Sequence, residues 1–318
     1  MNLKINKHLF SAFILTVVIL TSGCTMIEEF SDENIDVEEI KLEKVMIYKV
    51  SNYTGSLELS GLTQEYEMFI PYSDRYQKVE MPEGIETKRD EYGNYLTTAK
   101  ESYNLTFEFE VGSTRNDFED HEYPFEVPSE HENYLEKTKK VDPGNSQIKQ
   151  ISAELTENVS SSFEAVESMN NWTNEYLTYE ILGKRDLNTE QILEQKVGSC
   201  EEHTWLYTAL ARSAGIPTRV VAGWVERNGK VEAHMWAESW IPENGWIYVE
   251  PSNKEFRTIG VAHLKQYVGP DKLSEIYYGD MPQRTFRLNF DIDEYNCMIK
   301  NGKEECSLKS ENQVSDTL

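Results

Sequence analysis

The sequence predicts an α+β protein in which a small all-β, sandwich-like region precedes a core of helices and antiparallel strands. Short alternating apolar runs, separated by turn residues, fill the stretch from about residue 45 to 118. Beyond residue 146 the apolar residues recur at steps of three and four, as in amphipathic helices. Three further strand-like runs follow residue 215. Strands, then helices, then strands are typical of an α+β fold.

The first 23 residues have the pattern of a secretory signal peptide. Lys4 and Lys7 precede an apolar run from Leu9 to Leu20, and small residues follow it. This run is short against the ~20 residues that a membrane-spanning helix needs. We therefore expect residues 1–23 to be removed on export; an uncleaved anchor helix is the alternative. Either way the remainder is expected outside the cytoplasm, tethered to the membrane.

The residue after this segment is Cys24, which resembles the lipid-modified cysteine of prokaryotic lipoproteins. That resemblance implies acylation of Cys24 and a lipid anchor in the membrane. One position departs from the lipoprotein pattern: Thr21 stands where leucine is usual. Residues 24–42 are rich in acidic side chains and are expected to form a solvated tether.

Residues 43–127 are predicted to form the N-terminal β domain. Its strand-like runs are 45–50, 66–70 and 105–111. Prolines punctuate residues 128–145, which we interpret as a linker.

Residues 146–260 are expected to form the catalytic domain, and they open with helices. The helical period predicts one long helix from Ile148 that continues through Leu177, and a second over 189–196. A third helical run begins at Cys200 and ends before Gly215.

Cys200 is the candidate nucleophile because it lies at the start of this third helix. Unpaired backbone N–H groups and the helix dipole stabilise a thiolate at such a position, and the same groups can bind an oxyanion. The alternative is a buried cysteine that serves as a small apolar side chain.

His234 and Glu250 are the candidate base and its orienting carboxylate. They lie in two of three predicted strands, 219–225, 231–241 and 246–250. If Ile241 pairs with Trp246, Glu250 points away from His234, so the pair requires a shift of one residue, from a bulge or a five-residue loop. Glu238 shares the face of His234 and ranks as a substitute for Glu250.

The ordered motifs of this segment resemble the transglutaminase-like superfamily. They are Gly198-Ser199-Cys200-Glu201-Glu202, the helix that closes on Gly215-Ile216-Pro217, His234-Met235-Trp236-Ala237-Glu238, and Trp246-Ile247-Tyr248-Val249-Glu250-Pro251. The resemblance covers about 60 residues closely. It implies a papain-like core with a Cys-His-Asp triad, in which Cys200 and His234 keep their roles and Glu250 replaces the aspartate.

Residues 261–318 are predicted to be a C-terminal extension that contains a β-hairpin. A short helix is expected near 261–267. The Asn301-Gly302 turn places Cys297 directly opposite Cys306, within reach of a cross-strand disulfide. An oxidising compartment is consistent with that bond.

The sequence therefore predicts thiol-dependent acyl transfer at peptide or carboxamide carbonyls, with peptide hydrolysis favoured over amine transfer. The alternative is a non-catalytic surface binding module with a degenerate domain. A net charge of −25 argues against nucleic acid as a partner and leaves a protein or peptide substrate. No cofactor or metal is expected, because the histidines are scattered along the chain.

Overall fold

The computed structural model describes residues 46–59, 65–81, 83–99, 103–114, 118–181, 183, 187–227, 230–257, 263–271, 284–289, 294–300 and 303–308. The expected signal peptide, Cys24 and the acidic tether lie outside the described residues. Among those that are described, no helix combines the length and apolar character needed to cross a membrane.

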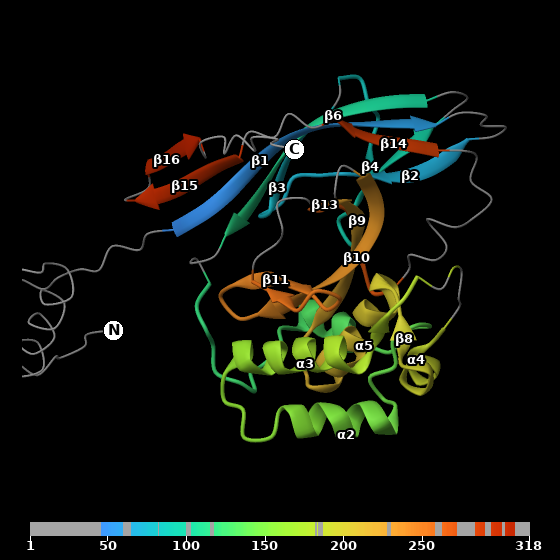
Figure 1. Cartoon of the computed structure of the whole chain (residues 1–318), viewed down its shortest axis with the longest axis vertical. Coiled ribbons are helices and arrows are strands. Elements are labelled where there is room, and N and C mark those ends of the chain that lie inside the picture. The colour runs from blue at the N-terminus through green and yellow to red at the C-terminus, as the bar shows by residue number, and fades with distance from the viewer. Residues whose placement is uncertain are drawn as a thin grey trace, which may run out of the picture. The chain divides into compact units, whose positions relative to one another are not determined.

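Helices form one layer of the core (Figure 1). Their bounds are η1 Ser129–Leu135, α2 Ser146–Leu155, α3 Ser162–Tyr176, α4 Thr189–Gln195 and α5 Cys200–Ser213. Side chains of α2, α3 and α4 pack around α5, which is buried along almost its whole length. The helix α5 therefore lies at the centre of the core, and the central sheet packs against it.

The expectation of one long helix from Ile148 was wrong, because the chain breaks between α2 and α3. Ser161 caps α3 by accepting a hydrogen bond from the backbone N–H of Glu164. Asp120 accepts further bonds from the Ser162 hydroxyl and the Phe163 N–H. These side chains satisfy N–H groups that a continuous helix would pair internally, so the second half starts as a new helix.

The central sheet is antiparallel, with strand order β12-β11-β10-β9-β13. The strands are β9 Thr218–Arg227, β10 Lys230–Ile241, β11 Gly245–Glu250, β12 Glu255–Phe256 and β13 His263–Gly269. Met235, Ala237 and Val249 belong to the core that contains α5. Trp236 and Tyr248 belong to a second cluster, consistent with the alternation of side chains along a strand.

The short helix expected near 261–267 was wrong, since this stretch contributes strand β13. It pairs with the free edge of β9, whose backbone groups otherwise lack partners. Gly223 makes this pairing close: a Cβ there would lie 1.9 Å from the carbonyl oxygen of Leu264. A glycine is thus required at position 223, where β13 pairs with β9.

The N-terminal strands share a sheet with the C-terminal strands. β1 Met46–Leu59 pairs with β6 Tyr103–Thr114, with β14 Arg284–Asn289 and with β15 Glu294–Lys300; β3 Gln77–Glu80 and β16 Lys303–Leu308 complete this six-stranded sheet. β2 Tyr66–Ile70, β4 Lys88–Arg89 and β5 Tyr95–Ala99 form a smaller sheet. A self-contained N-terminal β domain is therefore not confirmed, because the C-terminal strands β14, β15 and β16 complete its sheet.

The predicted C-terminal hairpin has the expected register. β15 and β16 pair Lys300 with Lys303 and Cys297 with Cys306. The backbone thus brings the two cysteines opposite each other, while the disulfide itself stays a prediction.

The stretch predicted as a linker packs against the core. Val141 is fully buried, and the buried Lys140 donates from Nζ to the carbonyl oxygen of Leu187 at 3.0 Å. Some of residues 128–145 therefore pack in the core, although the sequence pattern of this stretch is that of a linker.

A buried ion network joins the segment before β3 to the central sheet. Lys265 of β13 contacts both Asp74 and Glu238. Arg219 donates to Glu238 from Nε and Nη2, at 2.8 and 2.7 Å. Burial alone would lower the pKa of Lys265, but the two carboxylates outweigh it and raise that pKa.

Candidate active site

Cys200 is the first residue of α5, as the sequence predicts. Ser199 caps the helix, and Glu202 accepts from the Ser199 N–H at 2.8 Å and from its hydroxyl at 2.9 Å. Gly198 makes room for this arrangement, because a Cβ there would lie 2.3 Å from the Glu202 Cβ. The local sequence therefore fixes both the start of the helix and the position of the thiol.

The surroundings of the thiol oppose the activation expected from the helix start. Desolvation of the sulfur, and after it the Glu201 carboxylate, raises the pKa of the Cys200 thiol to about 12. The backbone N–H of Met235 donates to the sulfur, which by itself would lower that pKa. The group is thus a neutral thiol in this state. Met235 is the neighbour of His234 on β10, so the sulfur lies beside the strand that carries the candidate base.

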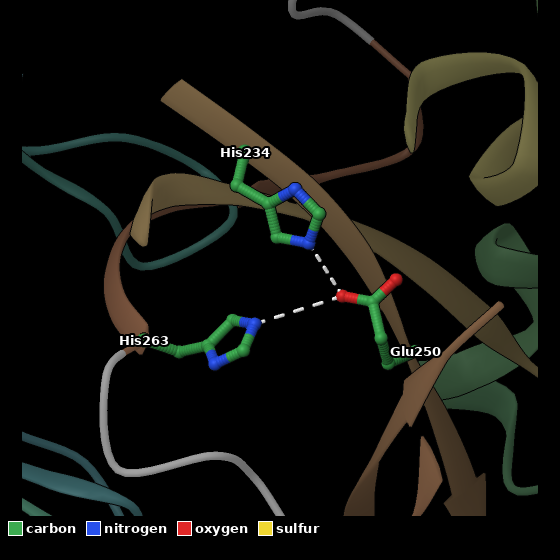
Figure 2. Close-up of side chains that lie close together, drawn as sticks. All are labelled: His234, Glu250 and His263. Atoms are coloured by element: carbon green, nitrogen blue, oxygen red, sulfur yellow. Dashed lines mark hydrogen bonds and ion pairs between the residues drawn. The ribbon is translucent and has the colours of Figure 1, made fainter. Parts of the chain in front are cut away.

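His234 and Glu250 meet across neighbouring strands (Figure 2). Nε2 of His234 lies 2.5 Å from Oε2 of Glu250, and both side chains are buried. Figure 2 shows the two side chains pointing toward one another.

The required one-residue shift in strand register is present. Ile241 pairs with Gly245, so Tyr248 lies opposite Glu238. Glu250 then shares the face of His234, because side chains alternate along each strand. The expected cause, a bulge or a five-residue loop, was wrong. Three residues, 242–244, connect the paired Ile241 and Gly245, one fewer than in the unshifted register, and φ is positive at Glu243 (63°) and Gly245 (74°).

Several groups hold the Glu250 carboxylate in place. Its Oε1 accepts from the Ser252 N–H at 3.0 Å and from the Ser252 hydroxyl at 2.5 Å, and Oε2 is left facing the imidazoles. Burial alone would raise the pKa of Glu250, but the His234 and His263 rings outweigh it and hold that pKa well below its usual range. A fixed carboxylate on Nε2 leaves Nδ1 of His234 as the ring atom available to a thiol.

The structure does not join Cys200 to His234. Between these two described residues there is no hydrogen bond, and the sulfur is paired with the Met235 backbone instead. The candidate base and its candidate carboxylate are in contact, whereas the candidate nucleophile is not hydrogen-bonded to that base.

Glu238, the ranked substitute for Glu250, is committed elsewhere. It pairs with Arg219 and Lys265 in the buried ion network and is completely buried. Its two partners account for its charge, so the structure favours Glu250 as the carboxylate beside His234.

His263 also contacts Glu250, a contact that no pattern in the sequence predicts. Its Nε2 lies 3.6 Å from Oε2 of Glu250 and 3.3 Å from the Tyr248 hydroxyl, and its ring centroid is 5.4 Å from that of His234. His263 lies beyond the recognised motifs, in a stretch that was expected to be helical. Only the pairing of β13 with β9 brings it to the site.

Residues 149–251 match the family model of the transglutaminase-like superfamily. This segment contains Cys200, His234 and Glu250 and coincides with the helical layer and the strands of the central sheet up to β11. The chain thus carries a transglutaminase-like domain with an α+β, papain-like core.

Among curated proteins, the chain is 27% identical over 126 residues to the uncharacterized protein YebA of Bacillus subtilis (strain 168), covering 33% of this chain and 17% of that protein. It is 33% identical over 73 residues to a protein-glutamine gamma-glutamyltransferase of Pseudomonas aeruginosa, covering 19% of this chain and 11% of that one. The chain therefore spans less than a fifth of the length of either relative.

Among solved structures, a candidate cysteine protease from Cytophaga hutchinsonii has a TM-score of 0.46 and 12% identity. The similarity covers 84% of this chain and 90% of that one.

Proposed function

We propose that this chain is an extracytoplasmic, membrane-tethered thiol enzyme that hydrolyses peptide bonds through acyl transfer at Cys200. His234 serves first as base and then as acid, and Glu250 orients the ring. The observation that carries the proposal is the 2.5 Å contact between His234 and Glu250, one residue from the Met235 N–H that binds the Cys200 sulfur.

The reaction follows from the orientation of the ring. With Nε2–H donating to Glu250, Nδ1 accepts the thiol proton, and the thiolate attacks the substrate carbonyl. N–H groups at the start of α5 donate to the resulting oxyanion. Collapse expels the amine, which takes its proton from His234, and leaves a thioester on Cys200. Water, deprotonated by His234, then releases the acid and restores the thiol.

An amine in place of water would give transfer instead of hydrolysis. The Pseudomonas aeruginosa relative is a protein-glutamine gamma-glutamyltransferase by name, which makes carboxamide substrates worth testing beside peptides. Release of new peptide termini and incorporation of a fluorescent amine into a protein substrate distinguish the two products. We expect hydrolysis to be the faster reaction, and Cys200→Ser to abolish both.

The resting thiol must approach His234 before it reacts. Its pKa of about 12 leaves almost no thiolate at neutral pH, and pairing with the ring is the step that would lower it. Catalytic hydrogen bonds are often long or absent before substrate binds, so the lack of a hydrogen bond between Cys200 and His234 is compatible with the proposal.

The deciding experiment is iodoacetamide labelling of Cys200 in the full chain between about pH 5 and pH 10, read by peptide mass spectrometry. We expect labelling at pH 6 to 7 to be at least ~10-fold faster in the wild type than in His234→Ala. Iodoacetamide reacts irreversibly with the thiolate, so it captures even a minor state in which Cys200 is paired with His234. His121→Ala is the matched control. Equal rates that rise only at high pH in both proteins would refute the proposal.

A second function, a non-catalytic surface binding module, is favoured by one observation. The raised thiol pKa, together with the absence of a Cys200–His234 bond, is what a degenerate site would retain. In that case His234 and Glu250 are a buried structural pair, and the rate at which iodoacetamide labels Cys200 is the same in His234→Ala as in the wild type.

The membrane tether has its own test. We expect Cys24 to incorporate an alkyne-tagged fatty acid in bacterial cells and Cys24→Ser to lose that label. Retention of the label by Cys24→Ser would exclude Cys24 as the lipid site.

A further inference from the structure

The side chains of His234, Glu250 and His263 converge on one buried point (Figure 2). One ligand atom from each residue lies within 4.8 Å of those of the other two, and Nε2 of His234 and of His263 lie 2.5 and 3.6 Å from Oε2 of Glu250. The three residues come from β10, β11 and β13. The triad chemistry uses the first two, but it assigns nothing to His263.

We propose that His234, Glu250 and His263 form a binding site for a divalent transition-metal ion of the zinc class. Two imidazoles and one carboxylate are a ligand set that holds zinc with a fourth position open. Ligand atoms bound at ~2.0–2.1 Å in a tetrahedron are separated by about 3.4 Å. The observed Nε2–Oε2 separations, 2.5 and 3.6 Å, bracket that value.

The surroundings of the three residues orient the ligand atoms. Ser252 occupies Oε1 of Glu250 with its N–H and hydroxyl, so Oε2 is the oxygen presented to both rings. The Tyr248 hydroxyl lies 3.3 Å from Nε2 of His263 and 3.5 Å from Oε2. Contacts such as those of Ser252 with Oε1 fix the orientation of a ligand in a metal site, whereas the Tyr248 hydroxyl would have to release Nε2 of His263 for a cation to bind there.

Gly223 allows the two histidines to meet. It pairs with His234 on one side and with Lys265 of β13 on the other, and a side chain there would collide with the β13 backbone. The glycine lets β13 lie close to β9 and brings His263 across β9 to the ring of His234.

Metal binding would switch off the acyl-transfer chemistry. A cation on Nε2 of His234 would replace the hydrogen bond that this nitrogen donates to Glu250, and it would withdraw electron density from the ring. Nδ1 is then a weaker base toward the Cys200 thiol. This consequence rests on the proposed function, whereas binding itself does not, so the two can fail separately.

The direct test is calorimetric titration of the full chain with zinc sulfate. We expect one site with Kd on the order of 1 μM or tighter. His263→Gln is expected to weaken binding by at least ~100-fold, and His121→Ala to leave it unchanged. Circular dichroism and thermal melts establish that each variant is folded. No binding by the wild type up to ~1 mM, or equal binding by folded His263→Gln, would overturn the proposal.

Cobalt(II) provides a second readout that is independent of activity. Nitrogen and oxygen ligation gives visible d–d bands without thiolate charge transfer, which is the expected result. A thiolate charge-transfer band that is lost in Cys200→Ser would mean that the metal binds the cysteine, and would overturn the proposed ligand set. Zinc binding by a protein that fails the labelling test supports the metal site and refutes only the proposed enzyme.

Discussion

The imidazole of His234 and the carboxylate of Glu250 form a buried pair whose facing atoms are 2.5 Å apart, although 16 residues separate them along the chain. The pair depends on the register of β10 and β11, because a shift of one residue would turn Glu250 to the opposite face. It also accommodates glutamate where the superfamily resemblance implies aspartate.

Replacing Glu250 with glutamine should lower kcat/KM for peptide hydrolysis by about 10²–10⁴-fold, because a neutral amide neither fixes the Nε2–H tautomer nor stabilises the imidazolium. Glu250→Asp should retain part of the activity, since it keeps the charge but withdraws it from the ring. Steady-state kinetics on a fluorogenic peptide measure both. Glu243→Gln, a change at an exposed position, is the control, and equal activity of Glu250→Gln and this control would exclude Glu250 from the triad.

The raised pKa of the half-buried Cys200 thiol should make stability depend on alkaline pH. Its pKa is raised from 9.0 to about 12, so its contribution is complete below the unfolded-state pKa and is lost as pH rises toward the folded value. Urea unfolding between pH ~8 and ~11 should therefore show a steeper loss of stability for wild type than for Cys200→Ser. Parallel pH curves for the two proteins would contradict the raised pKa of the Cys200 thiol.

Breaking the buried ion network should destabilise the fold strongly. Lys265→Met leaves Asp74 and Glu238 without their shared cation and should lower the free energy of unfolding by about 3–5 kcal/mol. Lys254→Met removes an exposed partner of Glu175 and should cost less than about 1 kcal/mol. Urea denaturation compares the two, and similar small losses would contradict the network's structural role.

The C-terminal hairpin should contain a disulfide between Cys297 and Cys306. Thiol titration of the denatured, unreduced protein should find neither cysteine free. Replacing both with serine should lower the free energy of unfolding by about 2–3 kcal/mol, the value expected for so short a loop. Finding both thiols free in protein exported through the native route would refute the bond.

Local patterns were enough to predict much of this fold. Gly198-Ser199-Cys200 specifies a capped helix start through contacts within four residues, and Asn301-Gly302 specifies a hairpin with Cys297 opposite Cys306. Each of these features depends only on residues that are close together in the chain, so it can be predicted from the local sequence.

Other features could not be read in this way. The period from Ile148 to Leu177 is helical throughout, yet Asp120, far away in sequence, helps to start a new helix at Ser162. The apolar content of 261–267 suits a helix or a strand, and the free edge of β9 selects the strand. In both cases a distant partner overrides a local preference.

The sequence by itself determined the chemical identity of the site: a cysteine at a helix start, a histidine and a carboxylate on successive strands, and the order that marks a transglutaminase-like domain. The tertiary structure decided the register that turns Glu250 toward His234, the arrival of His263, and the burial that keeps the Cys200 thiol neutral. These features depend on which strands pair and on which side chains exclude water from one another, and the residues involved are far apart in the chain. Neither effect produces a periodic pattern in the sequence.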